Sequence, residues 1–92
     1  MKPKPGPATY LNTREVEEAL PVVMRMYLEE ACSQKKVAKR LGCHERTLYY
    51  WMRANDLRVK FFKAKVEYLA RSVRGELGPV EREAIAEAAL RA

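Results

Sequence analysis

The sequence contains few of the residues that build cross-linked or metal-bound proteins. Its 92 residues include two cysteines and one histidine. Two cysteines cannot form the disulfide framework of a small secreted domain, and the spacing of Cys32, Cys43 and His44 fits no familiar zinc motif. We therefore expect reduced, packed thiols, no metal site and no cofactor.

Long apolar runs are also missing. Segments such as LPVVM at 20–24 fall far short of the roughly 20 apolar residues of a membrane span, and the N-terminus has no apolar signal core. A chain of 92 residues supports one small domain with little room for a catalytic cleft, and no nucleophile and base pair or carboxylate dyad stands out. We expect a cytoplasmic protein that is not an enzyme and has no membrane partner.

Basic residues, by contrast, are abundant and unevenly placed. The formal net charge is +6, yet residues 33–65 alone carry ten Lys or Arg side chains against Glu45 and Asp56, a surplus of eight. A local positive field of this kind attracts a polyanion such as nucleic acid. A solvated basic surface is the alternative explanation, and the charge alone is compatible with both.

The periodicity of the apolar residues predicts an all-α fold. No stretch from Gln34 onward alternates like a strand, and the first seven residues hold three prolines and a glycine, which exclude a helix there. We expect a flexible arm at 1–11, a helical core at 12–57 and a helical extension at 58–92.

A proline divides the first segment of the core. Because a proline inside a helix removes a hydrogen bond and clashes one turn back, Pro21 predicts a short helix at 13–19 and a second helix from Pro21 to about Ala31. Ser33 provides an N-cap for the next helix after a very short corner. The second helix carries an apolar stripe for burial, made of Val23, Met24, Tyr27, Leu28 and Ala31.

The extension begins with the longest predicted helix, at 57–77. Pro79 then begins a last helix, whose thin apolar face needs a partner. We favour 57–77 as the surface of a homodimer, and it is also a candidate surface for another protein. The long helix has an apolar seam of Val59, Phe62, Val66, Leu69 and Val73, and the last helix offers Val80, Ile85, Ala88 and Ala89.

Residues 35–57 follow the pattern of a helix-turn-helix. This motif needs apolar residues between its helices, one small residue where the backbones come close, and a turn residue that tolerates positive φ. Ala38 occupies the close-approach position and Gly42 the turn. The second helix, at about 44–54, is then the one that enters a major groove. The apolar positions hold Val37, Leu41, Cys43, Leu48 and Trp51.

In this register, one face of the second helix is free to contact DNA. Arg46 and Arg53 suit guanine O6 and N7 or phosphate, and Glu45 suits either a cytosine amino group or the positive end of the helix dipole. His44 stands where a capping residue is wanted, so we expect a cap or a phosphate contact. The other candidates are Thr47 for phosphate, Tyr49 and Tyr50 for phosphate or a thymine methyl, and Lys35, Lys36, Lys39 and Arg40 for the DNA backbone.

The segment TREVEEALPVVMRMYLEEACSQKKVAKRLGCHERTLYYWMRANDL resembles the Fis-type helix-turn-helix, which also ends the NtrC-type activators. The resemblance lies in the alanine of the first helix, Leu41-Gly42 at the turn, Arg46-Thr47-Leu48-Tyr49 on the second helix and the closing Leu57. It implies a homodimer that recognises half-sites in successive major grooves, with Arg46, Thr47, Tyr50 and Arg53 at the DNA. His44, Glu45 and Trp51 depart from the family's usual residues, and the ending TLYYW also resembles the transposase-associated helix-turn-helix.

These features together predict a sequence-specific double-stranded DNA-binding protein. We expect a small transcriptional regulator, of a size that phages encode, located in the cytoplasm or at the nucleoid. One alternative is a DNA-recognition subunit for packaging, transposition or excision. Another is a protein-interaction module whose basic face acts on the transcription machinery.

Overall fold

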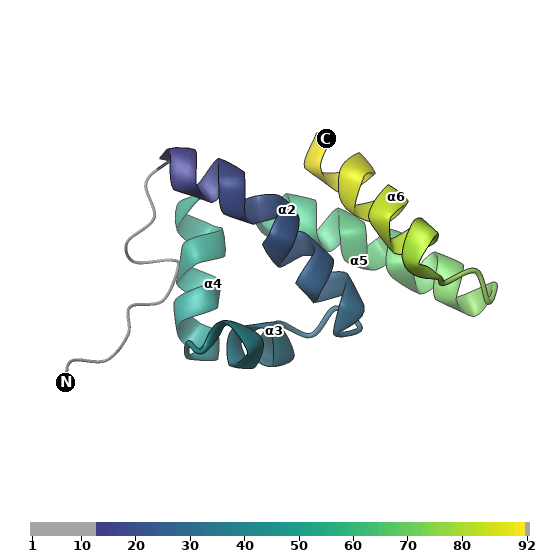
Figure 1. The fold of residues 1–92 in the computed structure, drawn as a ribbon, viewed down its shortest axis with the longest axis horizontal. Coiled ribbons are helices and arrows are strands. Elements are labelled where there is room, and N and C mark those ends of the chain that lie inside the picture. Colours follow the sequence, from purple (N-terminus) through teal and green to yellow (C-terminus); the bar gives the residue numbers. More distant parts are fainter. Residues whose placement is uncertain (1–12, 92) are drawn as a thin grey trace.

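The computed structural model describes residues 13–91, which form five α-helices and no strand (Figure 1). The all-α prediction is therefore confirmed for this part of the chain. The flexible arm predicted at 1–11 lies outside the described residues. The helices are α2 (Thr13–Glu29), α3 (Gln34–Leu41), α4 (Glu45–Ala54), α5 (Arg58–Val73) and α6 (Pro79–Arg91).

Helix α2 runs without a break through Pro21, so the predicted division into two helices is wrong. Pro21 is exposed, whereas Val16, Val23 and Tyr27 are buried on the opposite side of the helix. The hydrogen bond that Pro21 cannot donate is therefore lost on the solvent side, and packing before and after the proline holds the helix together. The predicted end was also too late, because α2 stops at Glu29.

A tight corner joins α2 to α3. Ala31 and Cys32 both have left-handed backbones, with φ of 56° and 62°, and Ala31 is exposed instead of belonging to the predicted apolar stripe. The Cys32 amide donates to the Tyr27 carbonyl at 2.7 Å, which closes the end of α2. Ser33 then caps α3 as predicted, since its hydroxyl accepts a hydrogen bond from the Lys36 amide at 3.3 Å.

Local hydrogen bonds fix both ends of the turn between α3 and α4. Gly42 has φ of 73°, in the left-handed region where glycine carries no steric penalty. The Cys43 amide donates to the Ala38 carbonyl at 3.0 Å, which ends α3. His44 caps α4, because its Nδ1 atom accepts a hydrogen bond from the Arg46 amide at 3.1 Å. The predicted turn glycine and the predicted histidine cap are therefore both confirmed.

The core holds α3 and α4 against α2. Trp51, Leu48 and Val37 are almost completely buried, while Leu41 and Cys43 are half-buried at its margin. The opposite wall of this core comes from the buried side of α2. Trp51 is therefore an anchor of the core, as predicted, and its ring is not available to stack on a base.

Helix α6 packs back against both α2 and α5 (Figure 1). Its buried residues are Ile85, Ala86 and Ala89. Val80 and Ala88, which we predicted for its apolar face, are exposed, and Ala86 was not predicted. The predicted and observed apolar faces differ because α6 packs against both α2 and α5. The side of α6 that is buried therefore depends on the positions of these two helices. The helical extension thus shares one core with the rest of the described chain.

Helix α5 is tied to its neighbours from one side. Phe61 and Ala64 are its buried residues, and the Phe61 ring meets Tyr27 of α2 edge to face, with ring centres 5.0 Å apart. The Lys60 ammonium donates to the Leu90 carbonyl at 2.9 Å, near the end of α6. These contacts fix which side of α5 remains for the solvent.

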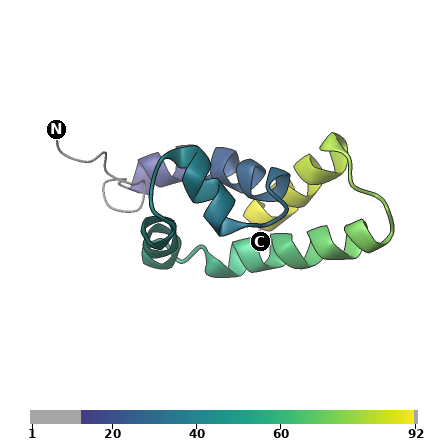
Figure 2. The same cartoon turned by 90° about the horizontal axis from the view of Figure 1, so that it is seen from below.

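Helix α5 is shorter than the helix predicted at 57–77. Leu57 is buried just before its first turn, and the helix ends at Val73, after which Gly75 turns the chain with φ of 72°. Figure 2 shows α5 along one edge of the molecule, with the other helices on its inner side.

Candidate nucleic-acid interface

Helix α4 divides its residues between the core and the solvent. Leu48 and Trp51 are buried, whereas Arg46, Tyr50 and Arg53 are exposed. The three exposed residues follow one another at steps of four and three, so they share the outer side of the helix. We call them the α4 face. The two guanidinium groups and the phenol are hydrogen-bond donors that suit the acceptor atoms of base edges and phosphates. The buried residues on the opposite side hold the helix in place.

The N-terminal end of α4 borders a shallow hollow of about 310 Å³. His44, Glu45, Arg46 and Tyr49 line it together with Gln34, from the start of α3. Because the Nδ1 atom of His44 accepts the capping hydrogen bond, that nitrogen carries no proton, and the Nε2 atom of this exposed side chain can donate outward. Glu45 lies in the first turn, where its charge complements the helix dipole. The hollow therefore brings together a hydrogen-bond donor of His44, the carboxylate of Glu45 and the guanidinium of Arg46.

Helix α3 carries basic residues of two kinds. The Nη1 atom of Arg40 forms ion pairs with Glu29 at 2.9 Å and Glu30 at 3.4 Å, at the end of α2. The hydrogen bond to Glu29 raises the pKa of Arg40 above its ordinary value. Arg40 is thus paired with two carboxylates of α2, and its expected contact with the DNA backbone stays a prediction. The other basic side chains of α3 are exposed, namely Lys35, Lys36 and Lys39.

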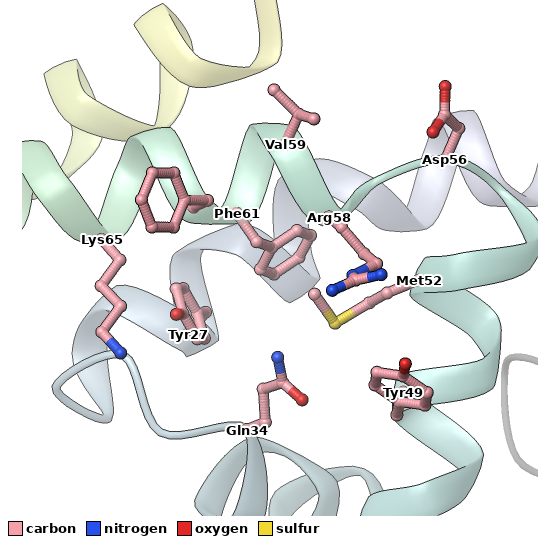
Figure 3. A pocket seen from close by; sticks show the side chains of 10 residues that line it. Tyr27, Gln34, Tyr49, Met52, Asp56, Arg58, Val59, Phe61 and Lys65 are labelled. Carbon is pink, nitrogen blue, oxygen red and sulfur yellow. The ribbon is translucent and has the colours of Figure 1, made fainter.

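A larger groove, of about 600 Å³, lies between α4 and α5 (Figure 3). Arg58 and Lys65 bring two positive charges to it from α5. The guanidinium carbon of Arg58 lies 5.9 Å from the centre of the Tyr49 ring, within the range of a cation–π contact. The other lining residues are Tyr27, Gln34, Met52, Asp56, Val59, Phe61 and Phe62.

The sequence analysis did not include Arg58 and Lys65 among the candidate DNA contacts. Both belong to the basic surplus at 33–65, but we assigned their helix to oligomerisation. One signal was available for Arg58, because it directly follows the buried Leu57 that closes the motif, so the first turn of α5 starts beside α4. The predicted residues Thr47 and Tyr49 are half-buried, which leaves them less open to a ligand than the α4 face.

Burial keeps the cysteines and one tyrosine neutral. It raises the pKa of the Cys32 thiol to about 11, against the lowering effect of Lys65, and it raises the pKa of Cys43 above its ordinary value. It also raises the pKa of Tyr27 to about 12. Protonated thiols are weak nucleophiles and poor metal ligands.

Within residues 13–91, no three His, Cys, Asp or Glu side chains are grouped to hold a metal ion, and no helix is long and apolar enough to cross a membrane.

Three basic surfaces therefore lie at the part of the molecule formed by α3, α4 and the first half of α5 (Figure 1). They are the α4 face, the exposed lysines of α3 and the groove with Arg58 and Lys65. Comparisons of the chain with models of known protein families, with curated proteins and with solved structures found no match.

Proposed function

We propose that the protein binds double-stranded DNA sequence-specifically, as a small transcriptional regulator that inserts α4 into the major groove. The observation that carries this proposal is the α4 face. Arg46, Tyr50 and Arg53 are exposed on a helix whose opposite side is fixed by the buried Trp51 and Leu48. A helix held in this way offers its donors in one fixed arrangement, which the recognition of base edges requires.

The connection between α3 and α4 supports the proposal. Gly42 is left-handed and Ala38 is buried, which are the properties that the turn and the close-approach position of a helix-turn-helix require. The exposed lysines of α3 lie on the helix that would cross the DNA backbone. Arg58 and Lys65 add positive charge on the α5 side of α4. Positive charge beside α4, from both α3 and α5, suits the phosphates that border a major groove.

We divide the residues into those that specify bases and those that position the protein. Arg46 and Arg53 can each form two hydrogen bonds with guanine O6 and N7. Tyr50 contacts phosphate or a thymine methyl. The remaining groups bind the DNA backbone without regard to sequence, and they are His44, Lys35, Lys36, Lys39, Arg58 and Lys65.

Fluorescence anisotropy titrations with labelled duplexes test this division. Arg46→Ala and Arg53→Ala should each cost about 1–3 kcal/mol in the preference for the best site over random duplex. Lys36→Ala should weaken binding to all sequences alike and lower the salt slope by about 1. Arg91→Ala on α6 is the control, since it removes the same charge from an exposed site away from α4 and should leave both quantities nearly unchanged. Undetectable binding at low salt, or an equal loss for all four variants, would refute the proposal.

The exposed apolar side of α5 favours a second candidate, a DNA-recognition subunit for packaging, transposition or excision, in which the C-terminal helices build a larger assembly. The mass in solution separates the two, because a ring of many copies suits packaging and a dimer suits regulation. A protein-interaction module on the transcription machinery would instead bind an acidic protein surface and show no preference among DNA sequences.

A further inference from the structure

Five apolar side chains of α5 face the solvent in one line, and we call them the α5 seam. They are five of the eight large apolar residues that are exposed in the described part of the chain. Figure 2 shows the reason, because α5 runs along an edge of the molecule and its outer side meets no other helix of residues 13–91. The exposed fractions are 59% for Val59, 65% for Phe62, 50% for Val66, 50% for Leu69 and 88% for Val73.

The spacing of the α5 seam is that of a helix pair. Its members are separated alternately by three and four residues, which is the 3.5-residue repeat of a coiled coil. A stripe of only two positions per heptad is narrower than the face that a helix usually buries within its own domain. Helix α5 already buries another side through Phe61 and Ala64. The seam is therefore a second surface, and its pattern is one that another copy of the same helix complements.

We propose that the α5 seam of a second copy covers this one, with the two helices antiparallel around a two-fold axis between Glu67 and Tyr68. In this register each layer of the interface joins a larger side chain to a smaller one, which lets the two seams interlock. Val59 remains at each end, beside the groove of Figure 3. The layers are formed by Phe62 of one copy with Val73 of the other and by Val66 with Leu69, each pair occurring twice.

The charges beside the α5 seam favour the antiparallel arrangement. The flanking positions are basic in the first half of the helix, with Arg58, Lys63 and Lys65, and uncharged in the second half, with Ala70 and Ser72. A parallel pair in register would place Arg58 of one copy against Lys63 of the other, and like charges at these positions repel. The antiparallel pair instead places Lys63 near Ala70 and Lys65 near Ser72 of the other copy. Its basic halves are thereby kept apart.

The same arrangement brings both copies of α4 to one side of the dimer. A two-fold axis perpendicular to the helix pair keeps equivalent flanks of the two helices on the same side. Helix α4 lies by the flank of α5 that carries Arg58 and Lys65, because both residues line the groove shared with Tyr49. The recognition helices are therefore not directed to opposite sides, as a parallel pair would direct them.

The distance between the two copies of α4 also suits DNA, a step that rests on the proposed function. Arg58 precedes the two-fold axis by nine to ten residues, or about 14 Å along the helix, so the two starts of α5 lie about 28 Å apart. Helix α4 lies beyond that start (Figures 1 and 2). The separation of the two α4 helices thus approaches the roughly 34 Å between successive major grooves on one side of the duplex.

The area of the α5 seam sets the strength of the dimer. Five side chains of this size and exposure offer on the order of several hundred Å² per copy, which is large for an apolar patch on a monomer. A standard interface buries about 800 Å² per partner, to which the stems of Lys63 and Lys65 would contribute. We expect a dimer at the lower end of specific interfaces, with a dissociation constant in the micromolar range.

Sedimentation equilibrium of the full chain, at about 100 µM, tests the proposal. The wild type should have twice the mass of the 10.6 kDa chain. Leu69→Glu should have the mass of one chain and an unchanged circular dichroism spectrum, because the leucine faces the solvent and not the core. Ser72→Glu and Ser72→Lys are a matched pair. The first places a carboxylate near Lys65 of the other copy and should tighten the dimer about threefold, and the second should weaken it about threefold.

A monomeric wild type, an assembly larger than a dimer, or Ser72 variants that do not shift the dimer constant in opposite directions would overturn the proposal. The DNA titrations separate this failure from that of the proposed function. A wild-type monomer that still prefers one DNA sequence would remove only the α5 dimer. A dimer that responds as expected to the Ser72 variants, but has no affinity for DNA, would remove only the DNA-binding function.

Discussion

Replacing Gly42 by alanine should lower the free energy of unfolding by about 0.5–1 kcal/mol, whereas replacing Ala31 by glycine should raise it by a similar amount. Both residues lie at corners between helices with left-handed backbones, at φ of 73° and 56°. A residue with a Cβ atom pays roughly 1–2 kcal/mol in this region. Glycine avoids this cost, but its greater conformational freedom in the unfolded chain reduces the gain by about 0.5–1 kcal/mol. The remaining difference lowers the free energy of unfolding in Gly42→Ala and raises it in Ala31→Gly.

Few other contributions enter this comparison. A Cβ atom added at Gly42 meets nothing within 4 Å, so the alanine variant neither clashes nor fills a cavity. Ala31 is exposed, so its methyl group buries little apolar surface that the glycine variant could lose. The two variants therefore report mainly on the backbone conformation of the corners that join α3 to its neighbours.

Urea denaturation followed by circular dichroism and by the fluorescence of the single tryptophan, Trp51, measures both changes. A change of 1 kcal/mol corresponds to about 4–8 °C in the midpoint of thermal unfolding for a domain of this size. If Ala31→Gly destabilised the protein, as it would inside a helix, α2 would have to continue past Glu29. If Gly42→Ala had no effect, the turn between α3 and α4 could not be left-handed.

Two further substitutions test the interior of α2. Pro21→Ala should raise the free energy of unfolding by about 2 kcal/mol, because it restores a hydrogen bond inside a continuous helix, and a loss in the same urea titration would show that the proline is needed there. Tyr27→Phe tests how the free energy of unfolding depends on pH. Burial raises the pKa of Tyr27 from 10.0 to about 12. The neutral hydroxyl therefore contributes stability that is complete below pH 10 and is lost as the pH rises through 12. Stability of the wild type should thus fall more steeply between pH 10 and pH 12 than that of Tyr27→Phe, and equal slopes would contradict the burial of the hydroxyl.

The parts of the fold that the sequence predicted well depend on neighbouring residues. Ser33 and His44 cap helices through amides two or three residues away, and Gly42 adopts a conformation that its lack of a Cβ atom permits. Such signals are complete within a few residues of sequence. For the same reason, the division of α4 between core and solvent followed from helical spacing alone.

The features that the sequence missed depend on distant contacts. Pro21 was expected to break α2, but the core on both sides of it outweighs the lost hydrogen bond. The ion pair of Arg40 with Glu29, eleven residues earlier, was not expected, and it forms because a corner brings the two helices together. Ala86 is buried in place of Val80 because α6 meets two helices at once. None of these arrangements can be read from spacing within one segment.

Selection of bound duplexes from random DNA tests most directly whether α4 recognises sequence. For the wild type we expect an enriched motif that occurs twice with two-fold symmetry, at about 10 base pairs from centre to centre. Each half should contain a guanine whose enrichment disappears when Arg46→Ala or Arg53→Ala replaces the wild type. A pool without any enriched motif, or a motif that both variants select unchanged, would contradict the assignment of the α4 face to DNA recognition.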